Sequence, residues 1–224
     1  MTDIQKMLFD LQDTAYRDFH SRLIPEINKD TIIGVCTPDV RSLAKKLYGT
    51  EIAEEFLHSL PHKYYDENNL HAFLIEQIRD FDTAISAVED FLPFIDNWAT
   101  CDMMRPKVFK KHLPSLKEKC FEWIKSNDTY TARFGIVMLM THFLDSEFSP
   151  EMLSAVARIK SEEYYISMAV AWHFATALAK QYESALPYLE SRCLDPLTHR
   201  RTIQKARESL RLTKEQKLYL KSLA

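Results

Sequence analysis

Glycine is scarce in this chain. Among 224 residues there are only three glycines, Gly34, Gly49 and Gly135. Tight hairpins and phosphate-binding loops depend on the positive φ angles that glycine adopts without strain. The sequence accordingly contains neither GxGxxG nor a P-loop, and no alternating apolar run is bounded by Asn-Gly or Asp-Gly. These absences argue against nucleotide-binding α/β folds and hairpin-rich β folds, and favour an all-α protein with short connections.

Motifs for metal binding, for a serine nucleophile and for export are also missing. The four cysteines form no CxxC pair, the eight histidines form no HExxH motif, and GxSxG is absent. The N-terminus, MTDIQKMLFD, lacks the basic and apolar regions of a signal peptide. The longest uncharged run, residues 164–179, is too short to span a bilayer comfortably. We expect a soluble cytoplasmic protein with no cofactor, no metal and no membrane partner.

Charge is unevenly distributed, although the formal net charge is only −3. Residues 51–96 contain eleven acidic side chains and two basic ones, whereas residues 199–224 contain eight basic and two acidic ones. Such asymmetry suggests that the C-terminal end faces a polyanion. The alternative is that these charges only solvate the outer faces of helices.

Apolar periodicity predicts helices throughout. Ile4, Met7, Leu8 and Leu11 form an amphipathic stripe, and Thr37 followed by Pro38 is typical of an N-cap and first helical turn. The sequence predicts one domain, residues 1–224, folded as a right-handed α-solenoid of HEAT-like repeats with a concave face. A compact bundle is the alternative. The further expected helices cover residues 51–59, 66–80, 82–94, 97–105, 106–125, 129–143, 149–159, 162–180, 182–191, 196–210 and 213–222. Two nearly continuous apolar stretches, residues 134–140 and 168–179, predict buried helices.

NWATCD, residues 97–102, places Trp98 and Asp102 four residues apart, on one face of a helix. Arg133 and Trp172 follow on separate helices and, in a solenoid, can line the same face. Indoles attract a cationic ligand, a carboxylate stabilises developing positive charge, and an arginine anchors a phosphate. A cationic alkylated purine on a DNA backbone presents a matching feature for each of these three groups. Each residue also has a structural interpretation: Trp98 in the core, Asp102 at a helix end paired with Arg133, and the neighbouring Cys101 as a buried thiol rather than a nucleophile.

Several motifs in order resemble the AlkD family of DNA alkylation repair proteins, which are HEAT-like-repeat DNA glycosylases. The matching segments are GVCTPDVR at 34–41, NWATCD at 97–102, TARFGIVML at 131–139, SMAVAWHFATALAK at 167–180 and DPLTHRRTIQKA at 195–206. The resemblance implies a monofunctional glycosylase that excises N3- and N7-alkylated purines. It implies Asp102 as the catalytic carboxylate, Trp98 and Trp172 as cleft tryptophans, and Arg133 as the active-site arginine.

The family resemblance also implies double-stranded DNA as the partner of a monomeric protein. With the basic C-terminal helices it suggests Arg41, Arg200, Arg201 and Lys205 as contacts to the DNA backbone. One segment departs from the family pattern, because the chain before Gly34 is short and interrupted at Pro25. It resembles a divergent subgroup without the N-terminal minor-groove helix. The alternatives are therefore a homologue that keeps the cleft but binds DNA weakly with little or no excision, and a helical-repeat protein-interaction module.

Overall fold

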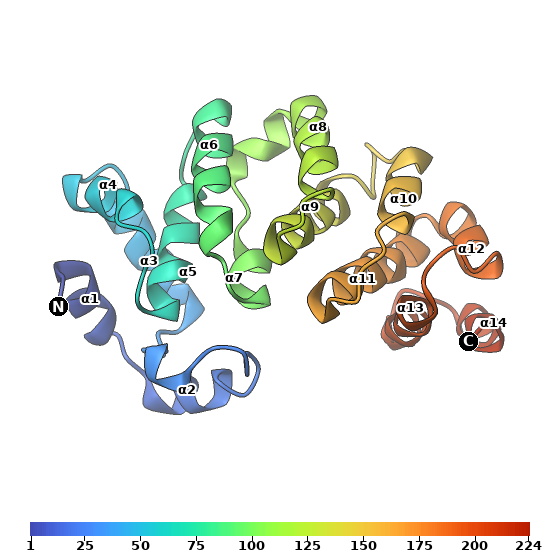
Figure 1. The fold of residues 1–224 in the computed structure, drawn as a ribbon, viewed down its shortest axis with the longest axis horizontal. Helices are drawn as coiled ribbons and strands as arrows, with labels where there is room; N and C mark the ends of the chain where they lie inside the picture. Colours follow the sequence, from blue (N-terminus) through green and yellow to red (C-terminus); the bar gives the residue numbers. More distant parts are fainter. The chain divides into compact units, whose positions relative to one another are not determined.

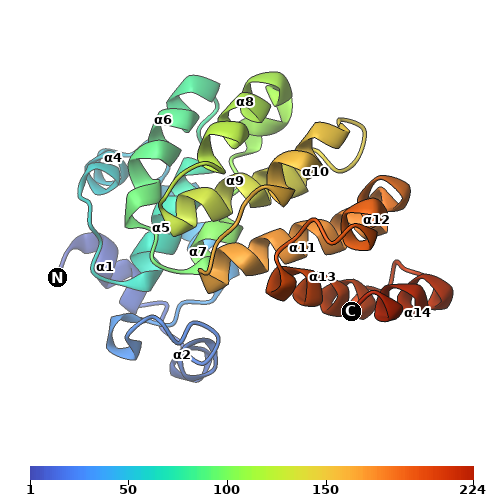
Figure 2. The same cartoon turned by 45° about the vertical axis from the view of Figure 1, so that its right-hand side comes forward.

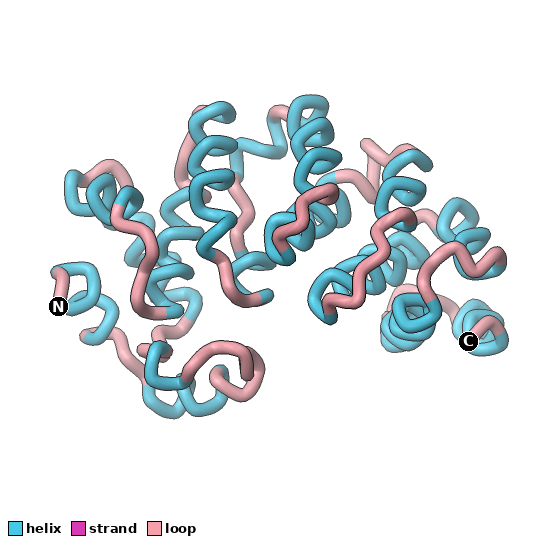
Figure 3. Tube along the Cα trace, viewed as in Figure 1, coloured by secondary structure: helices cyan, strands magenta, loops and turns pink.

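The computed structural model describes residues 1–224 and is all-α (Figure 1, Figure 3). It contains fourteen α-helices and three short 3₁₀ helices, and its only β-type pairing is an isolated bridge between Gln12 and Val35. The all-α prediction is therefore confirmed. No helix is both long and apolar enough to cross a membrane. The chain separates into two compact units, unit 1 (Met1–His112) and unit 2 (Leu113–Ala224), which are described one at a time. The single domain stays a prediction.

Unit 1 is organised around helix α5, which packs against the helices that precede and follow it in sequence. All eleven residues of α5, Tyr65–Ile75, are buried. Its neighbours include α1, α3, α4, α6 and α7. The helices of unit 1 are α1 (Asp3–Phe9), α2 (Thr14–His20), α3 (Thr37–Leu47), α4 (Glu51–His58), α5 (Tyr65–Ile75), α6 (Phe81–Phe91) and α7 (Trp98–Met103). The 3₁₀ helices are Lys29–Thr31, Leu92–Phe94 and Lys107–Lys111.

Polar side chains set most helix starts in unit 1. Thr50, Asp80 and Asn97 accept a hydrogen bond from a backbone N–H in the first turn of α4, α6 and α7, respectively.

Two expectations about helix boundaries were wrong in detail. The N-cap of α3 is Cys36, one residue before the predicted Thr37, and no side chain caps it. The helix predicted over 106–125 is a 3₁₀ helix followed by α8 (Leu113–Trp123), separated by His112 in a non-helical conformation.

Gly34 supplies a turn that only glycine accommodates without strain. Its φ is +92°, and a Cβ there would lie 2.5 Å from the Arg17 Cβ and 2.7 Å from the Asp13 carbonyl oxygen. This close approach lets the chain leading into α3 lie directly on α2. Gly49, whose φ is +81°, lies just beyond the end of α3 and is the other glycine with a positive φ.

Gly34→Ala is expected to destabilise the protein by more than about 2 kcal/mol, because backbone strain and a steric clash add together. Gly49→Ala is the matched control: its φ is also positive, but no atom lies within 4 Å of the added Cβ. That variant carries the backbone strain alone and should lose about 1–2 kcal/mol. Urea denaturation of the two variants measures the difference, and equal losses would contradict the clash.

Unit 2 is built around α11, which packs between α9 and α13 (Figure 1, Figure 2). Its helices are α8 (Leu113–Trp123), α9 (Thr129–His142), α10 (Pro150–Ala157), α11 (Tyr164–Lys180), α12 (Tyr182–Glu190), α13 (Pro196–Glu208) and α14 (Lys214–Ser222). Most residues of α9 and α11 are buried, which confirms the prediction made from the two apolar stretches.

Candidate functional site

Trp98 and Asp102 both lie on α7, as the NWATCD spacing predicted. Asn97 starts the helix: its side-chain oxygen accepts the Thr100 backbone N–H at 2.8 Å. Trp98 is half-buried, and Asp102 is only 7% exposed. A carboxylate kept this far from water interacts with a nearby cation more strongly than an exposed one does.

The Trp98 indole is held by the segment between α2 and α3. Its Nε1 donates a hydrogen bond to the Leu23 carbonyl oxygen at 3.1 Å. The ring packs against a buried apolar cluster, which contains Ile24, Ile32, Tyr65 and Ala99 with Ile27 and Met103 at its margin. The chain before Pro25 forms the seven-residue helix α2. The chain beyond it therefore covers part of the Trp98 side chain.

Arg41 points into unit 1. Its Nη1 donates to the Glu76 carboxylate, its Nη2 donates to the Met103 carbonyl oxygen at 3.2 Å, and the guanidinium lies 3.9 Å from the centre of the Phe73 ring. Burial raises the pKa of Glu76, and Arg41 offsets part of that rise. The Arg41 side chain bonds groups within the protein, but 38% of its surface is exposed to solvent. Its contact with a DNA backbone stays a prediction.

Arg133 contacts α11, the helix that carries Trp172. Arg133, on α9, is 5% exposed, and its Nη1 donates to the Tyr165 carbonyl oxygen at 2.7 Å. Trp172 lies seven residues after Tyr165, so the two aromatic residues share one face of α11. Trp172 is half-buried. Within unit 2, Arg133 therefore contacts the helix that carries the second candidate tryptophan.

The basic residues of α13 differ in their surroundings. Arg200 is exposed and makes no ion pair, whereas Lys205 is half-buried. Arg201 donates from Nη1 to the Ser167 Oγ at 2.7 Å and lies 4.7 Å from the centre of the Tyr164 ring. Of these three candidates, Arg200 is thus the cation most available to an external phosphate.

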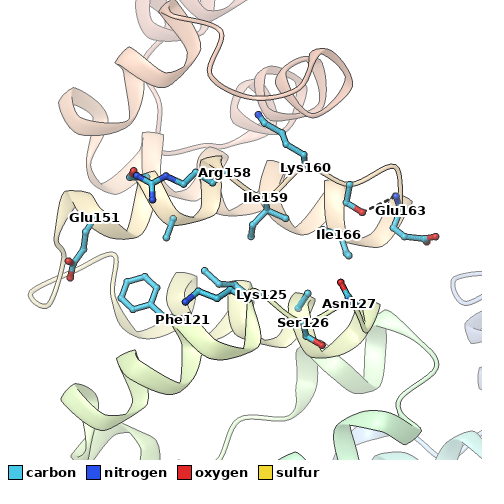
Figure 4. Close-up of a pocket in the computed structure, with 15 residues that line it drawn as sticks. Phe121, Lys125, Ser126, Asn127, Glu151, Arg158, Ile159, Lys160, Glu163 and Ile166 are labelled. Atoms are coloured by element: carbon cyan, nitrogen blue, oxygen red, sulfur yellow. Dashed lines mark hydrogen bonds between the residues drawn. The ribbon is translucent and has the colours of Figure 1, made fainter.

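A cavity of about 710 Å³ lies in unit 2, between the α8–α9 connection and the α10–α11 connection (Figure 4). Its apolar lining includes Phe121, Ile124, Ile159 and Ile166, and its rim carries Lys125, Arg158, Lys160, Glu151 and Glu163. None of the eight predicted site residues lines it.

Cys101, the candidate nucleophile, and the histidines lie in surroundings that favour structural roles over catalysis or metal binding. Cys101 is fully buried within α7, which favours the structural interpretation of its thiol. No three His, Cys, Asp or Glu side chains are arranged to hold a metal ion. Half-buried His62 and buried His71 form a pair, with 2.9 Å between the His62 Nε2 and the His71 Nδ1. Burial lowers the pKa of His62 to about 4 and that of His71 to about 3. His58 and His62 are four residues apart, but α4 ends at His58, so the two do not share a helix face.

Acid should weaken the fold through His173, which is fully buried on α11 and has a pKa lowered by that burial to about 4. Between its ordinary pKa of 6.5 and about 4, the unfolded chain binds a proton that the folded chain does not. Lowering the pH from 7 to 5 is therefore expected to remove about 2 kcal/mol of stability through this residue. Urea denaturation at pH 7 and at pH 5 measures the loss of unfolding free energy. In His173→Leu that loss should be smaller than in the wild type by about 2 kcal/mol. It should persist in the exposed control His58→Leu, and an unchanged pH dependence in His173→Leu would contradict the assignment.

Residues 4–211 match the family model described as DNA alkylation repair enzyme. The chain belongs to this family. The match covers α1 to α13, and so includes both tryptophans, Asp102 and all the candidate arginines. No curated protein sequence gives a match.

Sequence reasoning missed three buried polar side chains in α5 and at its C-cap, two of which, Asn69 and Glu76, bond α7 or the residue just after it. Asn69, Glu76 and Asp66 are 5%, 3% and 0% exposed. Their partners lie some thirty residues away in the chain, so no local pattern identifies them. The single available signal was the unusual density of Asp, Glu and Asn in a segment that must be helical.

Proposed function

We propose that this protein is a monofunctional DNA glycosylase that excises cationic N3- and N7-alkylated purines from duplex DNA. The observation that carries the proposal is α7, where a nearly buried carboxylate and a half-buried indole lie on one short helix of a DNA alkylation repair enzyme chain. The proposal includes a right-handed α-solenoid with a concave face as the architecture and a cytoplasmic monomer as the working form.

In the proposed reaction, water attacks C1′ of the deoxyribose and the bond from C1′ to the purine nitrogen breaks. The bonding electron pair leaves with the base, which departs neutral because alkylation had already given it a positive charge. Asp102 stabilises the oxocarbenium-like transition state and takes the proton of the attacking water. Trp98 and Trp172 offer indole faces to the cationic base, and Arg133 binds a phosphate. No cofactor enters this balance.

Base release from a duplex containing a single N7-methylguanine or N3-methyladenine tests the proposal. With enzyme in large excess, the intact protein should release the free base in a single exponential phase and leave an abasic site. A strand without the lesion is the control. Absence of release over many hours at saturating protein would refute the glycosylase.

A second candidate function is DNA binding without excision. It is favoured by the internal partners of Arg41, Arg133 and Arg201 and by the net charge of −3. Guanidinium groups that already bind protein atoms have fewer donors left for phosphates. In this case the chain binds duplex DNA weakly and releases no base.

Duplex affinity should depend on α13. Arg200→Ala with Arg201→Ala is expected to weaken duplex binding and to reduce the slope of log K against log salt by about two, since each phosphate contact contributes about 0.9. Fluorescence anisotropy over a range of salt concentrations measures the slope. Lys214→Ala with Lys217→Ala, on the following helix α14, is the matched double substitution. Equal slopes for the wild type and the Arg200/Arg201 variant would show that these charges only solvate the helix.

A further inference from the structure

Helix α7 is too short to fix its own direction. It has six residues, and a helix of that length is unstable without contacts from elsewhere. Its orientation therefore depends on α5, which packs directly against it. Two buried side chains reach α7: Asn69, on α5, and Glu76, the C-cap residue that continues α5 in helical conformation. They are seven residues apart, so they lie on the same face of α5, about 10 Å apart along its axis.

Asn69 holds the first turn of α7. The Thr100 hydroxyl donates to the Asn69 Oδ1 at 2.8 Å and accepts from the Asn97 Nδ2 at 3.1 Å. Thr100 and Asn97 are fully buried, and Asn69 is 5% exposed. Water therefore does not compete for these bonds, and they fix the rotation of the helix about its axis.

Glu76 holds the other end. Its Oε1 accepts the backbone N–H of Arg105 at 2.9 Å, just beyond the last turn of α7. Its other oxygen accepts from Arg41, which in turn donates to the Met103 carbonyl oxygen at the end of the helix. The Arg41 guanidinium thus binds a carbonyl that the helix leaves unsatisfied at its C-terminal end, and the Glu76 carboxylate binds the first N–H beyond the C-cap.

We propose that Asn69 and Glu76 are positioning residues that set the direction of Trp98 and Asp102 by holding α7 at both ends. The inference rests on the proposed glycosylase function and extends it to residues that touch neither base nor deoxyribose. Its physical basis is the sensitivity of catalysis to geometry, since a displacement of about 1 Å can lower a rate by about 100-fold.

Glu76→Gln tests the proposal at the better-defined end. Glutamine keeps an oxygen for the Arg105 N–H but turns an NH₂ group towards the Arg41 donors. The single-turnover rate of base release should fall by at least about tenfold, while the Kd for the same duplex stays within about threefold. Asn69→Ala should act in the same direction.

Glu67→Gln is the matched control. Glu67 is also a buried carboxylate of α5, at 3% exposed, but it accepts from Gln5 and from the backbone N–H groups of Lys63 and Tyr64. It should lose comparable stability and keep the wild-type rate once both variants are assayed well below their Tm. Equal rates for Glu76→Gln and wild type would overturn the proposal.

Hydrogen exchange of the DNA-free full-length protein separates this inference from the function on which it rests. Glu76→Gln should accelerate exchange of the Cys101 and Met104 amides, which bond within α7, and Glu67→Gln should not. If the wild type releases no base, the glycosylase fails and exchange alone decides the positioning role. Unchanged exchange in Glu76→Gln would then overturn it.

Discussion

Asp102→Asn is expected to lower single-turnover release of N7-methylguanine by about 100- to 1,000-fold while leaving duplex affinity almost unchanged. That range is typical when one preorganised electrostatic group is removed from a transition state. Asparagine has nearly the same shape as aspartate, so α7 keeps its packing. What disappears is the negative charge that, in the proposed reaction, faces the developing oxocarbenium ion. Because Asp102 is 7% exposed, water cannot readily replace that charge.

Asp82→Asn is the control for this experiment, since Asp82 is an exposed carboxylate in the first turn of α6. It removes the same charge from unit 1 and should leave the rate unchanged. Excision that survives Asp102→Asn would remove Asp102 from the chemistry. A loss of duplex affinity equal to the loss of rate would make Asp102 a binding residue instead.

The fold class was predictable because its signals are local. Scarce glycine, apolar periodicity and capping residues each act within a few positions, and they correctly indicated an all-α chain with buried helices near 134–140 and 168–179. The helix predicted over 106–125 failed for an equally local reason. His112 leaves the helical conformation and divides the segment, although apolar periodicity continues on both sides.

The buried charge of unit 1 was not predictable. Asp66, Glu67 and Glu76 were counted among the eleven acids of residues 51–96, for which solvation of outer helix faces was the stated alternative, yet all three side chains are buried. Each is satisfied by groups on other segments, such as Arg41 for Glu76, and such pairings have no periodic signature in the sequence. The motif on α7 identified which residues to examine, while the α5 side chains that hold α7 became visible only in three dimensions.

The second large effect is expected at Asp66. This fully buried carboxylate accepts the backbone N–H groups of three consecutive residues, Ile33, Gly34 and Val35, with shortest distances of 2.6, 3.2 and 2.7 Å. Burial raises the pKa of Asp66, and these three hydrogen bonds offset part of the rise. Asp66→Asn keeps one acceptor oxygen but places an NH₂ group against a backbone donor.

Asp66→Asn should therefore destabilise the protein by about 3 kcal/mol, because a buried N–H loses its partner and a charged acceptor is lost. Urea denaturation at pH 7 measures this, with the exposed Asp39→Asn as the control. A loss below about 0.5 kcal/mol, the range of ordinary surface substitutions, would contradict the role of the carboxylate.

The same turn connects Asp66 to Trp98. The three N–H groups flank Gly34, whose backbone lies on α2, and the chain that enters this turn carries Ile24 and Ile32 onto the Trp98 ring. Asp66→Asn and Gly34→Ala both disturb the turn at residues 33–35. The loss of stability in the double variant should therefore be smaller than the sum of the two separate losses. Both variants should also increase quenching of Trp98 fluorescence by acrylamide, in a Trp123→Phe, Trp172→Phe background. Additive losses and unchanged quenching would show that the turn and the indole are energetically independent.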